Sequence, residues 1–505
     1  MTRWPISYPL AALIALVTAA PIAVLVGLVE TPSEFFDSRN LDLLVNTLLL
    51  MLLTVTGAIV IGVPLAIITA YVRLPFAKLW LVLLAAPLAM PSYLGAFTFY
   101  AAFGPGGEID NLLGIGTPSA SGLPGATLVM ILYTYPFVLL TTRASLLSQD
   151  ASLINAARTL GLSLPMSLFK IALPRALRGI TAGALLSALY TLSDFGTPAF
   201  MGLDTFTRVI YVEYNAFGLD QAAMLSLQLL VIVGLVLFLE STIGVTLERP
   251  GRSLSLWPKR WQIPVLLAAV APVILLAIFL PLGIFTLWLL REGSGGFELE
   301  YAWNSTYASL LAAAVAVVLA LPVAYASIAG RFGRLMDRIT YLGFGVPGIM
   351  GTALVYVGLQ VPFMYQTLGL LIIAYVLRFL SLAVGSVRSS AEKLDASLNK
   401  AARVLGAGPS EVFWRVTVPL TLRGMIAGAA LVFLEVMREL PATLLLAPTG
   451  FETLATYLWR VYEAGYFGRA AIPGLLLVLM SALGLALMLF GERRAEFNVM
   501  EDKKS

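Results

Sequence analysis

Four charged side chains lie within two stretches that are otherwise apolar enough to cross a membrane. Asp194 lies in one such stretch, and Glu435, Arg438 and Glu439 lie in another. A charge at bilayer depth costs upward of about 2.5 kcal/mol, so such a residue tends to face a cavity or a partner charge. The four side chains are therefore candidates for a translocation pathway. Glu435 and Arg438 are three residues apart, so a purely structural pair on one helix is the alternative for them. Arg378, in a further apolar stretch, can reach an acidic residue in space.

The composition excludes several kinds of chemistry at these positions. The chain of 505 residues contains no cysteine and no histidine, which rules out disulfides, thiolate clusters and imidazole metal ligands. It also lacks the G-x-x-x-x-G-K-[ST] loop that cradles nucleotide phosphates. We therefore predict that the chain is not an enzyme, binds no cofactor of its own and has no nucleic-acid partner. A membrane-embedded enzyme with Asp194 and Glu439 as an acid–base pair is an alternative that no cofactor motif supports.

The elements that must position these residues are membrane helices. Hydrophobic residues make up 59% of the chain and charged residues 12%, whereas soluble domains carry about 25% charged residues. A helix that spans the bilayer needs roughly 20 mostly apolar residues. The sequence therefore predicts an all-α polytopic protein in a lipid bilayer. About twelve spans are expected, near residues 8–28, 43–71, 79–103, 122–142, 180–200, 221–246, 262–290, 306–330, 339–361, 367–387, 424–447 and 471–490.

Lysine and arginine are unequally distributed between the two sides of these spans. Most of the 32 lysines and arginines fall on the side that carries both chain termini, and positively charged loops stay in the cytoplasm. We therefore expect cytoplasmic N- and C-termini. The opposite loops collect carboxylates, which either attract a cationic partner or are simply tolerated there.

Two segments of the chain repeat each other without a gap. Residues 150–183 and 395–428 are identical at 15 of 34 positions, at a constant offset of 245 that also aligns Asp194 with Glu439. The repeat predicts two six-helix halves. They are parallel, because an even number of spans returns the chain to its starting side.

The repeat extends upstream of the long loops. Asn46 and Pro64 are spaced like Asn304 and Pro322, at a different offset of 258. The expected boundaries are 1–247 for the first repeat, 248–261 for a cytoplasmic linker and 262–505 for the second repeat.

Each repeat has one long cytoplasmic loop, at residues 143–179 and 388–423. The pattern predicts a helix capped by Asp150 or Asp395, a glycine break, and a second short helix. This second helix is expected to end before Pro174 or Pro419 and to lie along the membrane surface. The first helix carries two adjacent alanines for close approach and ends where a positive φ is required, at Ala156, Ala157 and Gly161 in one copy and Ala401, Ala402 and Gly406 in the other.

This pattern resembles the EAA loop of binding-protein-dependent ABC importer permeases, in which Glu-Ala-Ala precedes the glycine. Asn155 and Lys400 replace the glutamate here. The resemblance implies a type I ABC importer permease fold in a bacterial inner membrane. It also implies docking on two copies of a cytoplasmic ATPase, which would bind ATP and magnesium. Docking would fall on Ala156, Ala157, Gly161, Ala401, Ala402 and Gly406. Helices that merely pack on their own bundle are the alternative.

The segments Ser-Asp-Phe-Gly-Thr-Pro at residues 193–198 and Arg-Glu-Leu-Pro-Ala-Thr at 438–443 are similar to those of ferric-iron importer permeases. This resemblance implies a periplasmic binding protein as donor and Fe(III) as cargo. Hard carboxylate oxygens suit Fe(III), so Asp194 and Glu439 are expected to contact the metal transiently. Thiamine, polyamine and phosphonate importers have related permeases and stay open as alternatives. So does a different class, an ion-coupled secondary transporter.

Overall fold

A computed structural model describes residues 7–30, 37–104, 106–114, 116, 119–242, 254–345, 347–392, 394 and 396–483. These residues are almost entirely helical, and their only β-type pairing is an isolated bridge between Val72 and Leu256. Within this part of the chain, eight helices are long and apolar enough to cross a membrane, and a bent helix pair would make a ninth. The all-α polytopic class is therefore confirmed.

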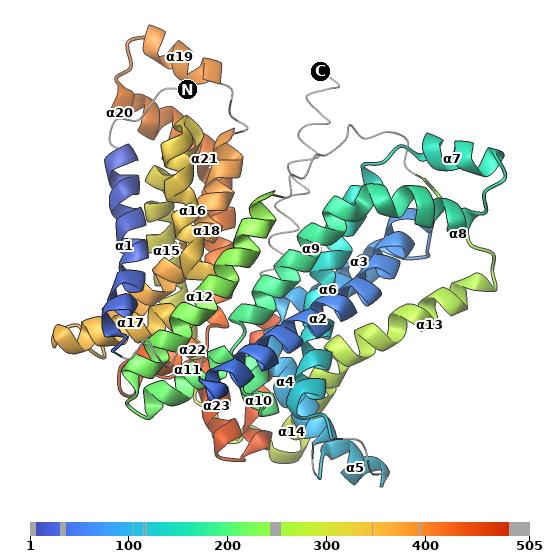
Figure 1. The fold of residues 1–505 in the computed structure, drawn as a ribbon, viewed down its shortest axis with the longest axis horizontal. Helices are drawn as coiled ribbons and strands as arrows, with labels where there is room; N and C mark the ends of the chain where they lie inside the picture. The colour runs from blue at the N-terminus through green and yellow to red at the C-terminus, as the bar shows by residue number, and fades with distance from the viewer. Residues whose placement is uncertain are drawn as a thin grey trace. The chain divides into compact units, whose positions relative to one another are not determined.

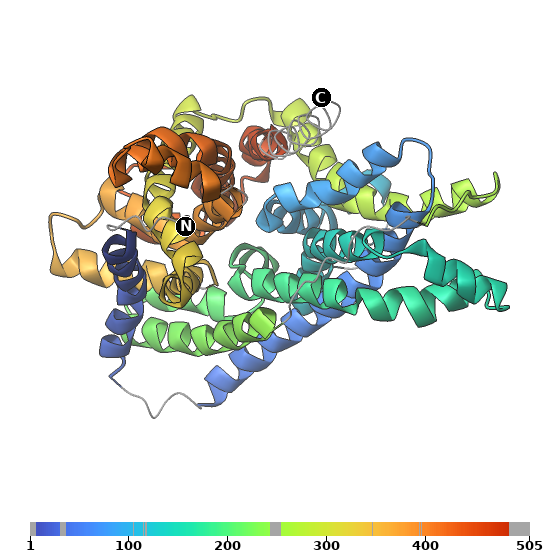
Figure 2. The ribbon, with the colours of Figure 1, turned by 90° about the horizontal axis from the view of Figure 1, so that it is seen from above.

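The chain divides into two compact units, which are described separately. One comprises Phe36–Arg208 and Val231–Gly293, and the other comprises Met1–Phe35, Val209–Leu230 and Ser294–Ser505. Figures 1 and 2 show the helices in two views at right angles to each other. The unit with residues 36–208 contains α2 (Ser38–Tyr71), α3 (Ala77–Ala85), η2 (Ala86–Ala89), α4 (Ser92–Phe103), α5 (Glu108–Leu113), α6 (Gly122–Leu147), α7 (Ala151–Thr159), α8 (Leu164–Ser167), η3 (Leu168–Ala172), α9 (Leu173–Ser193), α10 (Gly196–Met201), α13 (Gln262–Ile274), η4 (Leu275–Phe279) and α14 (Leu280–Glu292).

The other unit is built mainly from the second half of the chain. It contains α1 (Ser7–Leu28), α15 (Leu299–Ala329), α16 (Arg331–Gly345), α17 (Pro347–Gln360), α18 (Leu368–Glu392), α19 (Ala396–Val404), α20 (Pro409–Val412), η5 (Phe413–Thr417), α21 (Val418–Met437), α22 (Pro441–Leu446), α23 (Leu454–Glu463) and η6 (Phe467–Ala470). Two further helices, α11 (Phe206–Asn215) and α12 (Leu219–Thr242), run across the boundaries of the units.

These packing units do not coincide with the predicted sequence halves. Helix α1 belongs to the first half by sequence, yet it packs against α15, α16 and α17 of the second half (Figure 1). Conversely, α14 follows the predicted linker but packs against α4. Within a bilayer, van der Waals packing and hydrogen bonds between helices, rather than chain order, decide where an apolar helix packs. The division at 248–261 therefore describes the sequence repeat but not the packing.

The span expected near 79–103 is broken into two helices. The segment formed by α3 and η2 meets α4 at an angle of 92°. Pro91 lacks a backbone N–H and disfavours a helical conformation in the residue before it, and Met90 is accordingly extended with ψ of 136°. The expectation of one continuous span was therefore wrong, and the proline is the reason.

The spans expected near 180–200 and 424–447 both end early. Helices α9 and α21 stop at Ser193 and Met437, and the short helices α10 and α22 follow. The carbonyls freed at the two breaks are bound by threonines. Thr207 Oγ1 donates to the carbonyl of Asp194 over 2.8 Å, and Thr443 Oγ1 donates to that of Glu439 over 2.9 Å. The span expected near 471–490 lies partly outside the described residues.

Helices α9 and α21 approach their neighbours closely through equivalent glycines. A Cβ atom on Gly183 would stand 2.6 Å from the Cα of Val138 in α6, and one on Gly428 would stand 3.1 Å from the Cα of Ala383 in α18. Small residues spaced four apart allow helix backbones to approach in this way within membranes. The glycines thus fix the helices that follow the two long loops.

Replacing Gly183 with alanine is expected to lower the free energy of unfolding by about 1–3 kcal/mol, because the backbone of α6 cannot move away from the added methyl group. The matched control is Gly234→Ala in α12, where a Cβ atom meets nothing within 4 Å. The midpoint of thermal unfolding in detergent measures the difference. Equal midpoints for the two variants would contradict the close approach.

Candidate coupling loops and membrane carboxylates

The first long loop begins with a capped helix that ends at a glycine. At the start of α7, the backbone N–H of Ser152 donates to Asp150 Oδ1 over 2.9 Å. At its end, Gly161 has a φ of +94°, and the N–H of Leu162 donates to the carbonyl of Ala157 over 3.1 Å. A Cβ atom on Gly161 would meet nothing within 4 Å. The left-handed backbone, rather than crowding, therefore favours glycine here.

The second long loop has the same geometry at the offset of 245. Gly406 has a φ of +90°, and the N–H of Ala407 donates to the carbonyl of Ala402 over 3.1 Å. Asp395 and the side chain of Lys400 lie outside the described residues. The helix and glycine break predicted for both copies are thus present in the structure.

The short helix after each glycine differs from the expectation. It does not end before the proline, because α8 continues through η3 into α9, and α20 continues through η5 into α21. Both η3 and η5 are π-helical turns in which an N–H reaches back five residues, as from Leu173 to Leu168 and from Val418 to Phe413. Pro174 and Pro419, which lack an N–H, directly follow these turns and are accommodated in the first turn of α9 and α21.

Each loop helix has an inward and an outward face. Ala157 is buried beside Ile154 on the inner face of α7, whereas Ala156 is exposed. In the second loop, Ala402 is half-buried and Ala401 is exposed. The residues just before the two glycines project freely, since Leu160 is 84% exposed and Leu405 is 88% exposed. Each loop thus presents an apolar tip that its own unit leaves uncovered.

Asp194 lies at the break between α9 and α10 and is half-buried. Ser92 Oγ, at the start of α4, donates to Asp194 Oδ1 over 2.8 Å. The backbone N–H of Thr197 donates to Oδ2 over 3.0 Å. The carboxylate therefore joins the bend at α4 to the first turn of α10.

Glu439 occupies the equivalent break in the other unit but has a different partner. It is 4% exposed, forms an ion pair with Arg378 of α18, and accepts the N–H of Ala442 over 3.0 Å. Tyr375 of α18 and Thr443 of α22 share a hydrogen bond of 2.6 Å beside it. Arg378 thus reaches an acidic residue, which the sequence allowed but did not specify.

The remaining two charges also pair, because Arg438 Nε donates to Glu435 Oε2 over 3.1 Å. Asp194 and Glu439 belong to different units. Among the described residues, no group of three or more Asp, Glu, His or Cys side chains is placed to hold a metal ion. The pathway and metal-contact roles of these residues stay predictions. The structure adds Ser92, which no sequence spacing had indicated.

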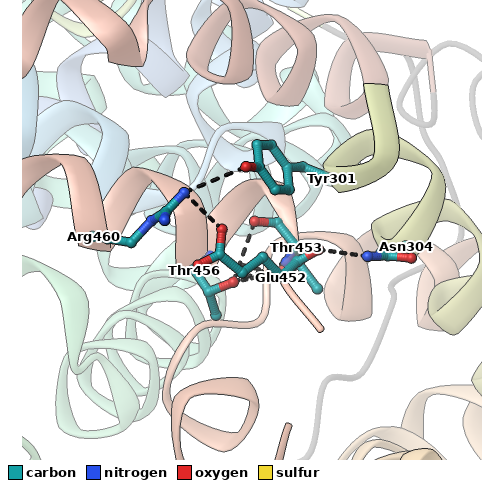
Figure 3. Close-up of polar contacts among 6 residues, drawn as sticks. All are labelled: Tyr301, Asn304, Glu452, Thr453, Thr456 and Arg460. Atoms are coloured by element: carbon teal, nitrogen blue, oxygen red, sulfur yellow. Dashed lines mark hydrogen bonds and ion pairs between the residues drawn. The ribbon is translucent and has the colours of Figure 1, made fainter. Parts of the chain in front are cut away.

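A further polar cluster lies where the loop after α22 meets α15 and α23 (Figure 3). Glu452 Oε2 lies 2.9 Å from Arg460 Nη2, and the Arg460 guanidinium lies 3.4 Å from the Tyr301 hydroxyl. Burial raises the pKa of Glu452 above its ordinary value of 4.5. The Arg460 cation opposes this rise, and the Glu298 carboxylate adds to it.

The raised pKa of Glu452 makes stability depend on pH. The folded state binds this proton more tightly than the unfolded state, so the free energy of unfolding is expected to fall as the pH rises from 4.5 through the raised pKa. Glu452→Gln should flatten this fall, and Arg460→Gln should extend it to higher pH. Thermal unfolding midpoints in detergent across this range measure both effects. An identical pH slope for wild type and Glu452→Gln would contradict the assignment.

The fold and the two equivalent loops define a membrane transport component built from one domain used twice. A model of the family of binding-protein-dependent transport system inner membrane components matches residues 62–249 and again residues 316–496. Each match contains one long loop and one of the two aligned carboxylates, Asp194 or Glu439. The chain belongs to this family and is a multi-pass ABC transporter permease with two fused permease domains.

Similar proteins extend this assignment. The Fe(3+)-transport system permease protein FbpB 2 of Haemophilus influenzae is 30% identical over 92% of both chains. The molybdenum transport system permease protein ModB of Escherichia coli is 30% identical, but over only 28% of this chain and 70% of its own length. The spermidine/putrescine transport system permease protein PotB of Haemophilus influenzae is 32% identical over 27% of this chain and 55% of its own.

Proposed function

We propose that this chain imports Fe(III), taking it from a periplasmic binding protein and passing it to the cytoplasm. The observation that carries the proposal is the similarity to a Fe(3+)-transport permease over 92% of both chains. The ModB and PotB permeases described above match little more than a quarter of this chain. Transport across a bacterial inner membrane with both termini in the cytoplasm agrees with the positive charge on that side.

In this proposal, the energy comes from ATP hydrolysed by two copies of a separate cytoplasmic ATPase, which bind ATP and magnesium. The chain itself binds no cofactor. Each ATPase subunit docks on the loop that carries Ala156, Ala157 and Gly161 in one unit and Ala401, Ala402 and Gly406 in the other. The exposed Ala156 and Ala401 are available to the ATPase, whereas the buried Ala157 packs within its own unit. The exposed Leu160 and Leu405 at the loop tips support this role, because an apolar tip gains from being covered by a partner.

ATP binding draws the two ATPase subunits together in this mechanism, and the loops move with them. Helix α9 follows the first loop and α21 follows the second, so displacement of a loop is passed directly to the segment that carries Asp194 or Glu439. The membrane helices then alternate between outward and inward openings. The loop and the membrane carboxylate of each unit are thus connected by a single helix.

The two membrane carboxylates take unequal parts in this pathway. Glu439 is neutralised by Arg378, so its charge is already matched and it serves mainly to hold α22 against α18. Asp194 is half-buried, whereas Glu439 is 4% exposed, which makes Asp194 the more accessible transient contact for a metal cation. Glu435 and Arg438, which precede Glu439 in the sequence, neutralise each other. Selection of Fe(III) over other cargo is left largely to the binding protein.

The cargo is tested by purifying the permease together with the ATPase and the binding protein that accompany it. The binding protein is then analysed for bound iron by elemental analysis and for thiamine, polyamines and phosphonates by mass spectrometry. The proposal expects iron alone. Thiamine or a polyamine would overturn the cargo but leave the permease assignment intact. Transport in proteoliposomes without any ATPase would instead indicate an ion-coupled secondary transporter.

A further inference from the structure

The loops that follow α10 and α22 are fastened in the same way, each within its own unit. Asn46 Nδ2 of α2 donates to the carbonyl of Asp204 over 3.1 Å. Asn304 Nδ2 of α15 donates to the carbonyl of Glu452 over 3.0 Å (Figure 3). The two loops differ in length and sequence, yet each is bound by the side-chain amide of an asparagine, and the two asparagines occupy equivalent positions in α2 and α15.

The residue after each asparagine makes a second bond to the same loop. Thr47 Oγ1 accepts the backbone N–H of Phe206 over 3.2 Å, and Ser305 Oγ accepts that of Leu454 over 2.8 Å. Each asparagine–hydroxyl pair therefore binds one carbonyl and one N–H of the loop, two residues apart. We call these two sets of bonds the outer clamps, one formed by Asn46 and Thr47 and the other by Asn304 and Ser305.

In each clamp, the residue whose hydroxyl accepts the loop N–H is buried. Thr47 is 5% exposed, Ser305 is 3% exposed and Leu454 is 1% exposed. A buried backbone group left without its partner costs about 1–3 kcal/mol. Opening either clamp without a replacement partner is therefore unfavourable, and the loop is expected to move together with the helix that binds it.

The chain order connects each clamp to the long loop on the other side of the membrane. In one unit the order is α7, α9, α10 and then the clamped loop, and in the other it is α19, α21, α22 and then the clamped loop. The clamp ties the far end of this path to α2 or α15, which also pack directly against α9 or α21. Each unit therefore contains a closed ring of helix contacts and hydrogen bonds.

We propose that Asn46, Thr47, Asn304 and Ser305 are positioning residues whose clamps stay closed throughout transport. Displacement of a long cytoplasmic loop is then transmitted in full to the clamped loop on the outer side of the membrane. The proposal rests on the function proposed above, because it requires ATP-driven movement of those loops. Opening of the pathway then comes from movement of whole helices, and the clamped loops do not act as separate gates.

The first arm of the test measures coupling. Asn46→Asp and Asn304→Asp keep the size of the side chain but replace the amide donor by a carboxylate facing a carbonyl oxygen. Combined in one chain and reconstituted with the ATPase and iron-loaded binding protein, they should raise the ATP hydrolysed per iron transported at least about ten-fold. The chain supplies its own control in the exchange Thr47→Ser with Ser305→Thr, which keeps both hydroxyls and should leave the ratio unchanged. An unchanged ratio in the aspartate variant would overturn the proposal.

The second arm needs no cargo, so it separates failure of the clamp from failure of the proposed function. The natural chain has no cysteine, so Leu454→Cys introduces a single thiol at a buried site. A membrane-impermeant maleimide added from outside should leave it unlabelled in the resting, ATP-bound and post-hydrolysis states, and should label it when Asn304→Asp is added. Labelling during normal ATP turnover would show that the clamp opens and would overturn the proposal. Iron transport failing in the unmodified complex would contradict only the proposed function.

Discussion

Replacing Arg378 with alanine is expected to lower the free energy of unfolding by about 3–5 kcal/mol, the loss seen when one partner of a buried ion pair is removed. The carboxylate of Glu439 is 4% exposed and would be left buried without its cation. The N–H of Ala442 would be its one remaining partner among the bonds described above. Thermal unfolding in detergent measures the loss.

The half-buried pair of Glu435 and Arg438 provides the matched control. Glu435→Gln should cost much less, because both side chains of that pair are partly exposed and water can solvate the remaining charge. The double variant Arg378→Met with Glu439→Leu should recover most of the stability lost by Arg378→Ala, since no unpaired charge remains. If Arg378→Ala were as stable as Glu435→Gln, the buried pair would not be the element that holds α22 to α18.

Combining Leu160→Glu with Leu405→Glu is expected to lower ATP-driven transport by at least about ten-fold, because a loss of 1.4 kcal/mol in ATPase docking already corresponds to a factor of ten. Both leucines are more than four-fifths exposed at the loop tips, so folding should be little affected. Transport and the amount of ATPase that co-purifies are the two measurements.

Phe363→Glu is the control for this variant, because Phe363 is 82% exposed on a loop expected on the opposite side of the membrane. It should retain both transport and ATPase co-purification. Normal co-purification and transport in the double leucine variant would remove the loop tips from the docking surface, whatever the effect of the control.

The two long loops illustrate what the sequence can predict. A capping aspartate, a helix and a glycine are local features, and the cap of Asp150 and the positive φ of Gly161 and Gly406 follow from residue type alone. Because the repeat has a constant offset, the same aspartate, helix and glycine pattern occurs in both loops, and each copy supports the prediction for the other. The continuation through Pro174 was missed because a π-helical turn removes the conflict that a proline normally creates.

Contacts between distant parts of the chain could not be predicted in the same way. Arg378 and Glu439 are 61 residues apart, and Asn46 and Asp204 are 158 apart. No local pattern specifies such partners, although the charge of Arg378 within an apolar helix required some partner. The packing of α1 against the second half of the chain could not be predicted for a related reason. The sequence of a uniformly apolar helix does not indicate which neighbouring helices it will contact.

The most direct test of the proposed function is iron uptake by proteoliposomes that contain the purified chain with its ATPase. Iron-loaded binding protein is supplied on one side and ATP on the other, and uptake and ATP hydrolysis are followed together. We predict that uptake requires both ATP and the binding protein, and that it falls with the double leucine variant. Uptake of equal rate without ATP or without the ATPase would contradict the account.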